Sequence, residues 1–346
     1  MASGAILDGK RELLARGLSW SGVLSMLARL PARDSLLVLT YHRIGNPEHD
    51  PFDPGVFSAT GDQFNEQISY LKRNLSLVTL EEALEFVDGT IKEKTRRCRV
   101  LITFDDGYLD NYEIAFPILL SHDVQGVFFL CTSLIGSCFV PWWDHIAYVM
   151  KTARRRQFSV GYPARLDVDI DKYGMAASLR SMFALFKAAE NIDSERFIRE
   201  LREVAEGQDL PAASRRFLNW DEAREMLAGG MAIGSHTHSH PVLSQLKPEE
   251  QRKEFTQSQA ILKERLGIEA KVLAYPFGHS TSFSEQTQHL AQQIGFRAAF
   301  SYFGEMANQR GTMERYNLKR VPVAGQRRFH FQAQTAFCRL TGRFWP

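Results

Sequence analysis

The segment Leu101–Tyr108, Leu-Ile-Thr-Phe-Asp-Asp-Gly-Tyr, most constrains the fold of this chain of 346 residues. Its apolar and β-branched first half, preceded by Val100, is typical of a buried strand. Two carboxylates, Asp105 and Asp106, follow directly, and Gly107 then lets the backbone turn. In α/β folds, ligands bind beyond the carboxyl ends of the strands, so chemistry is expected here. A solvated Asp-Gly turn between a strand and a helix fits the same residues.

A second cluster of polar residues lies far away in the sequence. Residues 234–241 read Gly-Ser-His-Thr-His-Ser-His-Pro and contain three of the ten histidines. His236 and His240 are four residues apart, a spacing that puts two side chains on one face of a helical turn and suits metal ligands. Imidazole binds zinc and the neighbouring transition-metal ions. Because adjacent Asp side chains diverge, Asp106 can join the histidines as a ligand while Asp105 stays free as a base.

These two clusters resemble motifs of the polysaccharide deacetylases, also called carbohydrate esterase family 4 or the NodB-type domain. Thr103–Gly107 looks like the first motif of this family, and Ser235–Pro241 looks like the second. Ala274–Gly278, Ala-Tyr-Pro-Phe-Gly, is similar to the branch that deacetylates poly-N-acetylglucosamine. The motifs occur in the family's order, and the resemblance runs from about residue 36 to about residue 323. It implies an α/β fold, a distorted (β/α)7-type barrel with a helical insertion.

The resemblance also implies a metal-dependent active site. Asp106, His236 and His240 would hold a divalent metal ion, with zinc as the first choice and cobalt, nickel, manganese or iron as alternatives. Asp105 would act as the general base. In the poly-N-acetylglucosamine branch the motif order looks circularly permuted, and the general acid is a histidine from an N-terminal Tyr-His segment. His42 matches that position and follows a predicted strand at residues 35–40.

The sequence departs from the family pattern at two points. Many members carry an arginine at the position of Ala274, where it steers the catalytic aspartate. Arg320, in the last predicted strand, Leu318–Val323, is the substitute that we predict, and we expect its side chain to point into the site. The usual C-terminal Leu-x-His acid motif is also absent, which favours His42 as the acid and leaves His330 as the alternative.

Several other side chains are predicted to contact a substrate. Aromatic faces stack on the C–H surfaces of sugar rings, which suggests a binding role for the Pro-Trp-Trp-Asp segment, although a core anchor fits this segment equally well. The predicted substrate-binding residues are Tyr108, Trp143, Tyr275, Phe277 and Arg320. The backbone N–H of Phe277 is in addition expected to stabilise the oxyanion.

The alternation of strands and helices favours a parallel barrel. We expect an amphipathic helical segment at 1–33, the barrel domain at 34–325 with the helical insertion at about 146–217, and a basic tail at 326–346. The net charge of +2 and the apolar fraction of 44% give no indication of nucleic-acid binding. The four cysteines form no Cys-x-x-Cys pattern and are expected to be free thiols.

The basic, amphipathic pattern of residues 10–33 favours a helix packed over the domain, with a helix lying on a membrane surface as the alternative. The apolar run at the N-terminus is too short for a signal peptide, and no apolar run is long enough to span a membrane. We therefore expect a cytoplasmic protein, with peripheral membrane contact through this helix as the alternative.

The predicted function is hydrolysis of the acetamide of an N-acetylated amino sugar in a polysaccharide, an oligosaccharide or a lipid-linked glycan. Another hydrolase of non-peptide C–N bonds on the same fold, and a non-catalytic carbohydrate-binding protein, are the alternatives. Asp105 argues against a pure binding protein, because such a protein has no use for a base. A serine hydrolase is not indicated, because no Gly-x-Ser-x-Gly segment occurs.

Overall fold

The computed structural model describes residues 35–48, 50–91, 98–189, 192–211, 215–302, 314–323 and 328–341, without the side chains of 328–330 and 338–340. The predicted N-terminal segment at 1–33 therefore lies outside the described residues. The chain divides into two compact units, and each is described by itself.

The larger unit is built on one sheet with the strand order β11-β10-β9-β6-β5-β1-β12, and β4 pairs with the beginning of β5. All strand pairs in this sheet are parallel, as the alternation of strands and helices predicted. The strands are β1 (Leu36–Tyr41), β4 (Ser76–Leu77), β5 (Arg99–Phe104), β6 (Gly126–Leu130), β9 (Ala232–Ser235), β10 (Val272–Ala274), β11 (Ala298–Phe300) and β12 (Val321–Pro322). A separate small pair joins β2 (Arg43–Ile44) to β3 (Phe57–Ala59).

The two ends of the sheet meet through the segment that leads into β12. Leu318 forms a parallel bridge with Phe300 of β11. Three residues later, Val321 pairs with Leu39 of β1. This segment therefore has a sheet neighbour on each side and links the first and last strands of the order. The predicted fold class, a distorted barrel of seven parallel strands, is confirmed.

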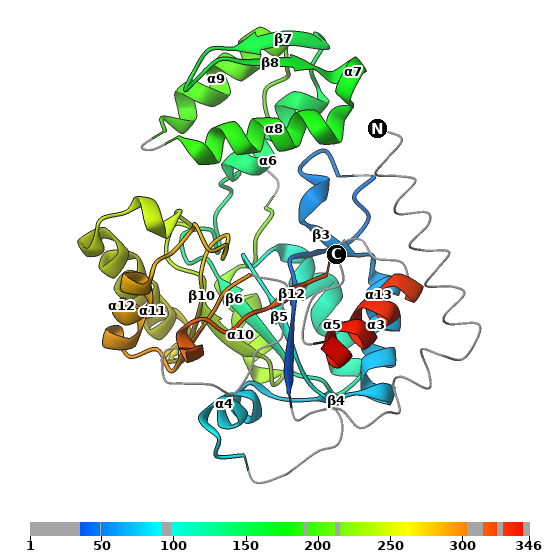
Figure 1. Cartoon of the computed structure of the whole chain (residues 1–346), viewed down its shortest axis with the longest axis vertical. Helices are drawn as coiled ribbons and strands as arrows, with labels where there is room; N and C mark the ends of the chain where they lie inside the picture. Colours follow the sequence, from blue (N-terminus) through cyan, green and yellow to red (C-terminus); the bar gives the residue numbers. More distant parts are fainter. Residues whose placement is uncertain are drawn as a thin grey trace. The chain divides into compact units, whose positions relative to one another are not determined.

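Helices cover the outer face of this sheet (Figure 1). Their apolar sides form one core with the outward-facing residues of the strands, for example Phe64 of the first helix with Tyr41 and Phe104. The covering helices are α3 (Gly61–Asn74), α5 (Phe116–Ser121), α10 (Trp220–Ala228), α11 (Pro248–Leu266), α12 (Glu285–Ile294) and α13 (Arg328–Thr341). A π-helical turn, η2 (Asn111–Ala115), precedes α5. Most of the predicted C-terminal tail thus forms a helix.

Inside the barrel, every second residue of a strand points inward. Leu36 and Val38 of β1 and Leu101 of β5 belong to an apolar cluster that also contains residues of α4 (Leu80–Asp88). Arg99, the first residue of β5, lies over the ring of Phe86 in this helix, so α4 covers the amino ends of the strands. The interior is therefore closed and apolar at that end.

Toward the carboxyl ends of the strands, the inward-facing residues become polar. Thr40 of β1 and Thr103 of β5 come next in the alternation, and their hydroxyl oxygens are 3.3 Å apart. His42 and Asp105 follow two residues later in each segment. The alternation of the strands thus delivers these two side chains to the open end of the barrel.

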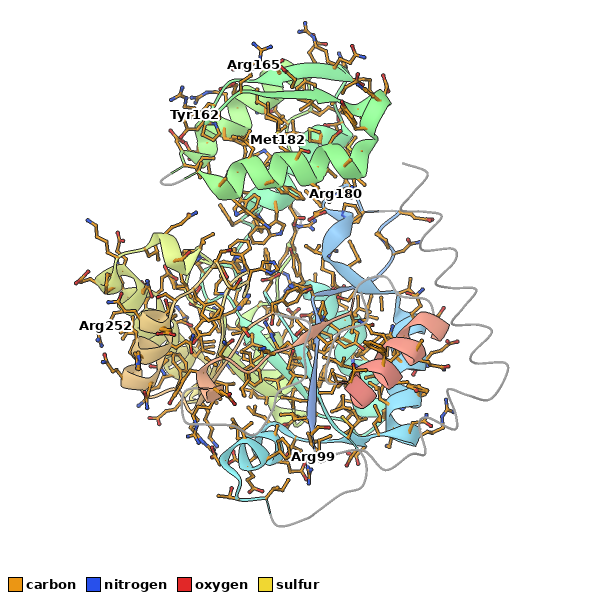
Figure 2. All side chains as sticks on the ribbon, in the orientation of Figure 1. Arg99, Tyr162, Arg165, Arg180, Met182 and Arg252 are labelled. Carbon is orange, nitrogen blue, oxygen red and sulfur yellow. The ribbon has the colours of Figure 1, made fainter. Side chains whose placement is uncertain are left out.

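The smaller unit contains residues 46–56 and 138–216. Its core includes Met182, which is fully buried, whereas Arg165 and Arg180 are exposed (Figure 2). Its elements are η1 (Pro54–Val56), α6 (Trp142–Lys151), β7 (Gln157–Val160), β8 (Leu166–Asp169), α7 (Ile170–Tyr173), α8 (Met175–Ala188) and α9 (Ser194–Ala205). The helical insertion expected at about 146–217 thus also contains an antiparallel hairpin. Four-residue strands are too short for their alternation to stand out in a charged sequence.

None of the described helices is long and apolar enough to cross a lipid bilayer. Cys98, Cys131 and Cys138 form no disulfide bond among the residues that the structure describes.

Candidate active site

The polar residues predicted from distant segments meet at the carboxyl ends of neighbouring strands. The backbone N–H of Asp105 donates a hydrogen bond to the carbonyl oxygen of Tyr41 at 3.0 Å, which places Asp105 beside His42 at the ends of β5 and β1. The N–H of His236 donates to the carbonyl oxygen of Leu130 at 2.9 Å and continues the pairing of β9 with β6. The sheet itself therefore brings the two sequence clusters together.

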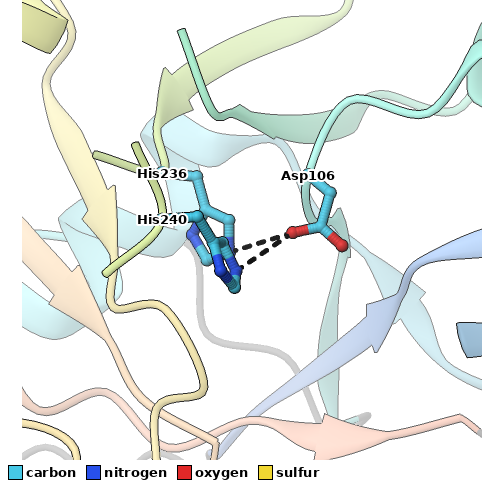
Figure 3. A group of neighbouring side chains, drawn as sticks. All are labelled: Asp106, His236 and His240. Carbon is cyan, nitrogen blue, oxygen red and sulfur yellow. Dashed lines mark ion pairs between the residues drawn. The ribbon is translucent and has the colours of Figure 1, made fainter. Parts of the chain in front are cut away.

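Asp106, His236 and His240 form a buried group that fits a metal ion (Figure 3). The Nε2 atoms of His236 and His240 lie 3.4 and 3.3 Å from Oδ1 of Asp106. This oxygen is buried and makes no hydrogen bond among the residues that the structure describes. A buried carboxylate oxygen that faces two imidazole nitrogens is a donor set that divalent zinc or a similar cation prefers.

The histidine segment is a loop, so the prediction of a helical turn is wrong. Within residues 236–240, Thr237 and His240 have left-handed backbones with φ of 65° and 60°. Asp106 is also left-handed, with φ of 74°. Residues with a side chain rarely adopt this conformation, and its cost is met by surrounding contacts. Two of the three candidate ligands therefore sit at strained backbone positions, which are typical of functional sites.

His236 is oriented by a contact on its other ring nitrogen. Its Nδ1 lies 2.9 Å from the carbonyl oxygen of Ala274. A carbonyl oxygen can only accept, so Nδ1 carries a proton, and Nε2 is the ring nitrogen that faces Asp106. Nε2 is therefore the nitrogen of His236 that could bind a metal ion.

Arg320 forms hydrogen bonds with both carboxylate oxygens of Asp105. Nη1 donates to Oδ1 and Nη2 donates to Oδ2, each at 2.7 Å, and the two side chains are 1% and 3% exposed. Nε of Arg320 donates to the carbonyl oxygen of Ser301 at 3.0 Å. Burial by itself would raise the pKa of Asp105, but the charge of Arg320 holds this pKa below its usual value. Asp105 is therefore ionised.

Burial and nearby charges also act in opposite directions on the pKa values of Asp106, His236 and His240. Burial opposes the charge of Asp106, yet contacts with the two histidines hold its pKa well below the usual range. Burial would lower the pKa of His236, and the charges of Asp105 and Asp106 raise it instead. Burial dominates at His240 and lowers its pKa. Two ionised carboxylates thus make the site attractive to a cation.

His42 is held through its backbone. Its N–H donates to Oγ of Ser58 at 3.0 Å, and its carbonyl oxygen accepts from Nδ2 of Asn111 at 2.7 Å. Its imidazole contacts the ring of Tyr302 edge to face, with 6.0 Å between the ring centroids. A positive charge on His42 would lower the pKa of both aspartates.

Tyr302 is a site residue that the sequence reasoning missed. Burial, with the negative charge of Asp105 as the next cause, raises the pKa of its phenol. A signal was available, because Ala298 and Phe300 face the interior and Tyr302 continues their alternation by two residues. The ring of His279 contacts Tyr302 from another side, with 5.8 Å between centroids.

The remaining predicted residues fall into two groups. Phe277, with φ of 60°, lies beside the metal-binding group and places its ring edge to face with that of His240 at 4.9 Å. Tyr275, by contrast, is buried, and its hydroxyl donates to the carbonyl oxygen of Tyr316.

Tyr108 and Trp143 are also buried. Tyr108 stacks on Phe217 at 4.9 Å, and Trp143 belongs to the smaller unit, where it packs edge to face on Trp142. The substrate contacts predicted for Tyr108, Trp143 and Tyr275 stay predictions. The side chain of His330, the alternative acid, lies outside the described side chains.

Comparison with known proteins identifies relatives for most of this chain. Residues 92–299 match the sequence profile of the polysaccharide deacetylase family. The poly-β-1,6-N-acetyl-D-glucosamine N-deacetylase of Staphylococcus epidermidis is 31% identical over 117 residues, 30% of this chain and 39% of that protein. YxkH of Bacillus subtilis is 23% identical over 233 residues, 67% of this chain and 54% of YxkH. The chain thus spans about half or less of the length of these curated relatives.

Solved structures share the fold. The Streptococcus pyogenes deacetylase PplD, in complex with acetate, has a TM-score of 0.57 at 18% identity and covers 87% of this chain and 98% of its own. IcaB from Ammonifex degensii has a TM-score of 0.55 at 21% identity and covers 88% of this chain and 97% of its own. The profile match extends over more than half of the chain and includes both aspartates and both histidines of the site. The chain belongs to the polysaccharide deacetylase family.

Proposed function

We propose that this protein is a metal-dependent N-deacetylase that hydrolyses the acetamide of an N-acetylated amino sugar in a glycan. One observation carries the proposal. An ionised, buried Asp105, held by Arg320 at 2.7 Å through both oxygens, stands next in sequence to the ligand group of Asp106. A water-activating base beside a cation site is what amide hydrolysis requires.

Asp106, His236 and His240 would hold the cation, and zinc suits two imidazoles and one carboxylate. When bound, the cation supplies an acidified water and polarises the acetamide carbonyl. Three protein ligands leave coordination positions open for water and substrate.

Asp105 is the general base of this proposal. Its low pKa keeps it unprotonated at neutral pH, so it can take the proton of the attacking water. The bidentate contact with Arg320 fixes the plane of the carboxylate, and each carboxylate oxygen retains acceptor capacity for that proton.

His42 is the general acid of this proposal. An amine leaves an amide only when its nitrogen is protonated, so a proton donor is needed on the side of the leaving group. Ser58 and Asn111 hold the backbone of His42, and the ring of Tyr302 limits the movement of its imidazole. The backbone N–H of Phe277 is assigned to the developing oxyanion, since Phe277 adjoins His240.

The relatives support the choice of substrate. The Staphylococcus epidermidis relative is a poly-β-1,6-N-acetyl-D-glucosamine N-deacetylase, and the Streptococcus pyogenes neighbour is a deacetylase solved with acetate. We extend the class of substrate, an N-acetylated glycan, to this chain, and include polymeric, oligomeric and lipid-linked forms.

Acetate release from a panel of N-acetylated sugars tests the proposal. We expect release from at least one N-acetylated amino-sugar glycan, its loss when a chelator removes the metal, and its return when zinc or another divalent ion is added back. Acetate release only from amides that carry no sugar would contradict the proposed class of substrate. Full activity in protein shown by elemental analysis to be free of metal would exclude the metal.

A further inference from the structure

On one side, the loop that carries the histidines forms hydrogen bonds with a single glutamate. Oε2 of Glu254, on α11, accepts the backbone N–H groups of His238 and Ser239, each at 2.8 Å. Oε1 of the same carboxylate accepts the hydroxyl of Ser239 at 2.7 Å. Three donors from two consecutive loop residues thus converge on one side chain of a helix of 19 residues.

The other side of the loop is attached to the segment that follows β6. The N–H of Ser133 donates to the carbonyl oxygen of His238 at 2.9 Å. The ring of His238 is fixed at both nitrogens, with Oγ1 of Thr132 at 3.0 Å from Nδ1 and Nε2 of Gln257 at 3.1 Å from its Nε2. The middle of the loop is therefore clamped between α11 and the end of a strand.

This clamp holds a conformation that the loop would not keep alone. The left-handed backbones at Thr237 and His240 are strained, and such strain persists only where surrounding contacts fix it. If the loop relaxed, His240 would move relative to His236, because the strained residue Thr237 lies between them and His240 is itself strained. The distance of 3.3 Å from His240 to Asp106 depends on the same conformation.

We propose that Glu254 is a positioning residue that pre-forms the metal site by holding residues 237–240 in their strained conformation; this inference rests on the proposed function. The hydrogen bonds of Glu254 come from His238 and Ser239, which lie between the two histidine ligands. Its effect on the metal therefore passes through the geometry of the loop. Outer contacts of this kind change metal affinity by roughly 10-fold to 100-fold when they are removed.

A set of three variants tests the inference. Glu254→Gln keeps the shape of the side chain but cannot accept from all three donors. Ser239→Ala removes one of these hydrogen bonds and changes no charge. Glu249→Gln, at an exposed position in the first turn of the same helix, removes a charge without touching the loop and serves as the control.

Two measurements are made on each variant. The first is the affinity for zinc, determined by competition with a chromogenic chelator. The second is hydrogen exchange of the amides of residues 237–240 in metal-free protein. We expect Glu254→Gln to weaken zinc binding by about 10-fold to 100-fold and to speed amide exchange. Ser239→Ala should change both quantities in the same direction by less, and Glu249→Gln should change neither.

The outcomes separate the inference from the proposed function. Wild-type protein that binds no zinc or other divalent ion would overturn the proposed function itself. Wild type that binds zinc while Glu254→Gln binds it equally well would overturn only the role of Glu254. An equal loss of zinc affinity in Glu249→Gln would show a general effect of charge and would also overturn the role of Glu254. If Glu254→Gln fails to fold, unchanged zinc affinity in Ser239→Ala overturns the inference and weakened affinity supports it.

Discussion

Arg320 and Asp105 form two parallel hydrogen bonds of 2.7 Å although a whole strand separates their segments in the sheet. Arg320 directly precedes β12, Asp105 directly follows β5, and β1 lies between these strands. The arginine therefore reaches across the interior of the barrel. The role predicted for Arg320, steering of the catalytic aspartate, stays a prediction that substitution can test.

Arg320→Lys should keep a positive charge in the interior but lose the paired contact. Lysine presents a single ammonium and cannot match both carboxylate oxygens in one plane. We expect kcat for acetate release to fall by at least about tenfold, the loss of about 1.4 kcal/mol of transition-state stabilisation. Metal content, measured by elemental analysis, should not change. A variant with unaltered kcat would show that orientation of Asp105 does not depend on this pair.

Asp105→Asn should separate the roles of the two adjacent aspartates. The amide cannot accept a proton from water, so the rate should fall about a hundredfold or more, the scale of lost general base catalysis. Bound metal should remain at the wild-type level, because Asp106, and not Asp105, belongs to the candidate ligand group. Loss of metal from Asp105→Asn would mean that the two roles are reversed.

His240→Ala should remove most of the bound metal and the activity while the protein stays folded. The three candidate ligands come from two separate segments, Asp106 from one and both histidines from the other, and each would be needed to complete the set. Elemental analysis and circular dichroism measure the two effects. His289→Ala, at an exposed position on α12, is a matched control that should keep its metal. His238 lies between the ligands and should tolerate substitution better than His240. Equal metal content in wild type and His240→Ala would contradict the proposed metal site.

His42→Asn should affect two substrates differently. The amine of an acetamide needs a proton in order to leave, whereas the phenolate of an activated ester leaves with little help. We expect turnover of the amide to fall strongly and turnover of the ester to fall much less, with substrate binding and metal content nearly unchanged. Equal losses on both substrates, or a barely slowed amide, would place the acid elsewhere, with His330 as the next candidate.

Glu81 should contribute stability that depends on pH. Glu81 lies on α4 and pairs with Arg297 and Lys271, which directly precede β11 and β10. Hydrogen bonds from Arg297 and then Lys271 lower the pKa of Glu81. A lowered carboxyl pKa stabilises the folded state above the pKa of unfolded chains, and this contribution is lost as pH falls through the lowered value.

Glu81→Gln should therefore lower the free energy of unfolding at neutral pH and not in acid. These side chains are exposed, so the loss should be at most about 1 kcal/mol and should shrink in high salt. Urea unfolding at about pH 7 and about pH 3, with and without added salt, measures this. A difference from wild type that is the same at both pH values would contradict an ionic cause.

The parts of the fold and site that follow from local pattern could be predicted from the sequence. The buried strand before Asp105 is visible as an apolar run, and the order of the motifs places the histidines at the same end of the sheet. Periodicity also indicates which strand residues face inward. Arg320 could be singled out because it follows Leu318 by two residues in a predicted strand and therefore faces the same side as that apolar residue.

Features that depend on contacts between distant segments could not be predicted in this way. Glu254 contacts the histidine loop from 15 and 16 residues away, and nothing in the pattern of its helix distinguishes it from its acidic neighbours. The left-handed backbones at Thr237 and Phe277 are imposed by tertiary contacts on residues that prefer other conformations. The four-residue spacing of His236 and His240 therefore suggested a helical turn where the structure has a loop.

The closure of the barrel through the segment that leads into β12 has a consequence for the order of events during synthesis. Arg320 follows Asp105 by 215 residues, so the carboxylate leaves the ribosome long before its cation does. An ionised carboxylate without a partner is costly to enclose, which disfavours completion of the interior around Asp105 at that stage. A nascent chain that stops short of Leu318 lacks both the last sheet neighbour of Phe300 and the counterion of the base. The proposed base therefore gains its counterion only late in synthesis, once Arg320 has been added to the chain.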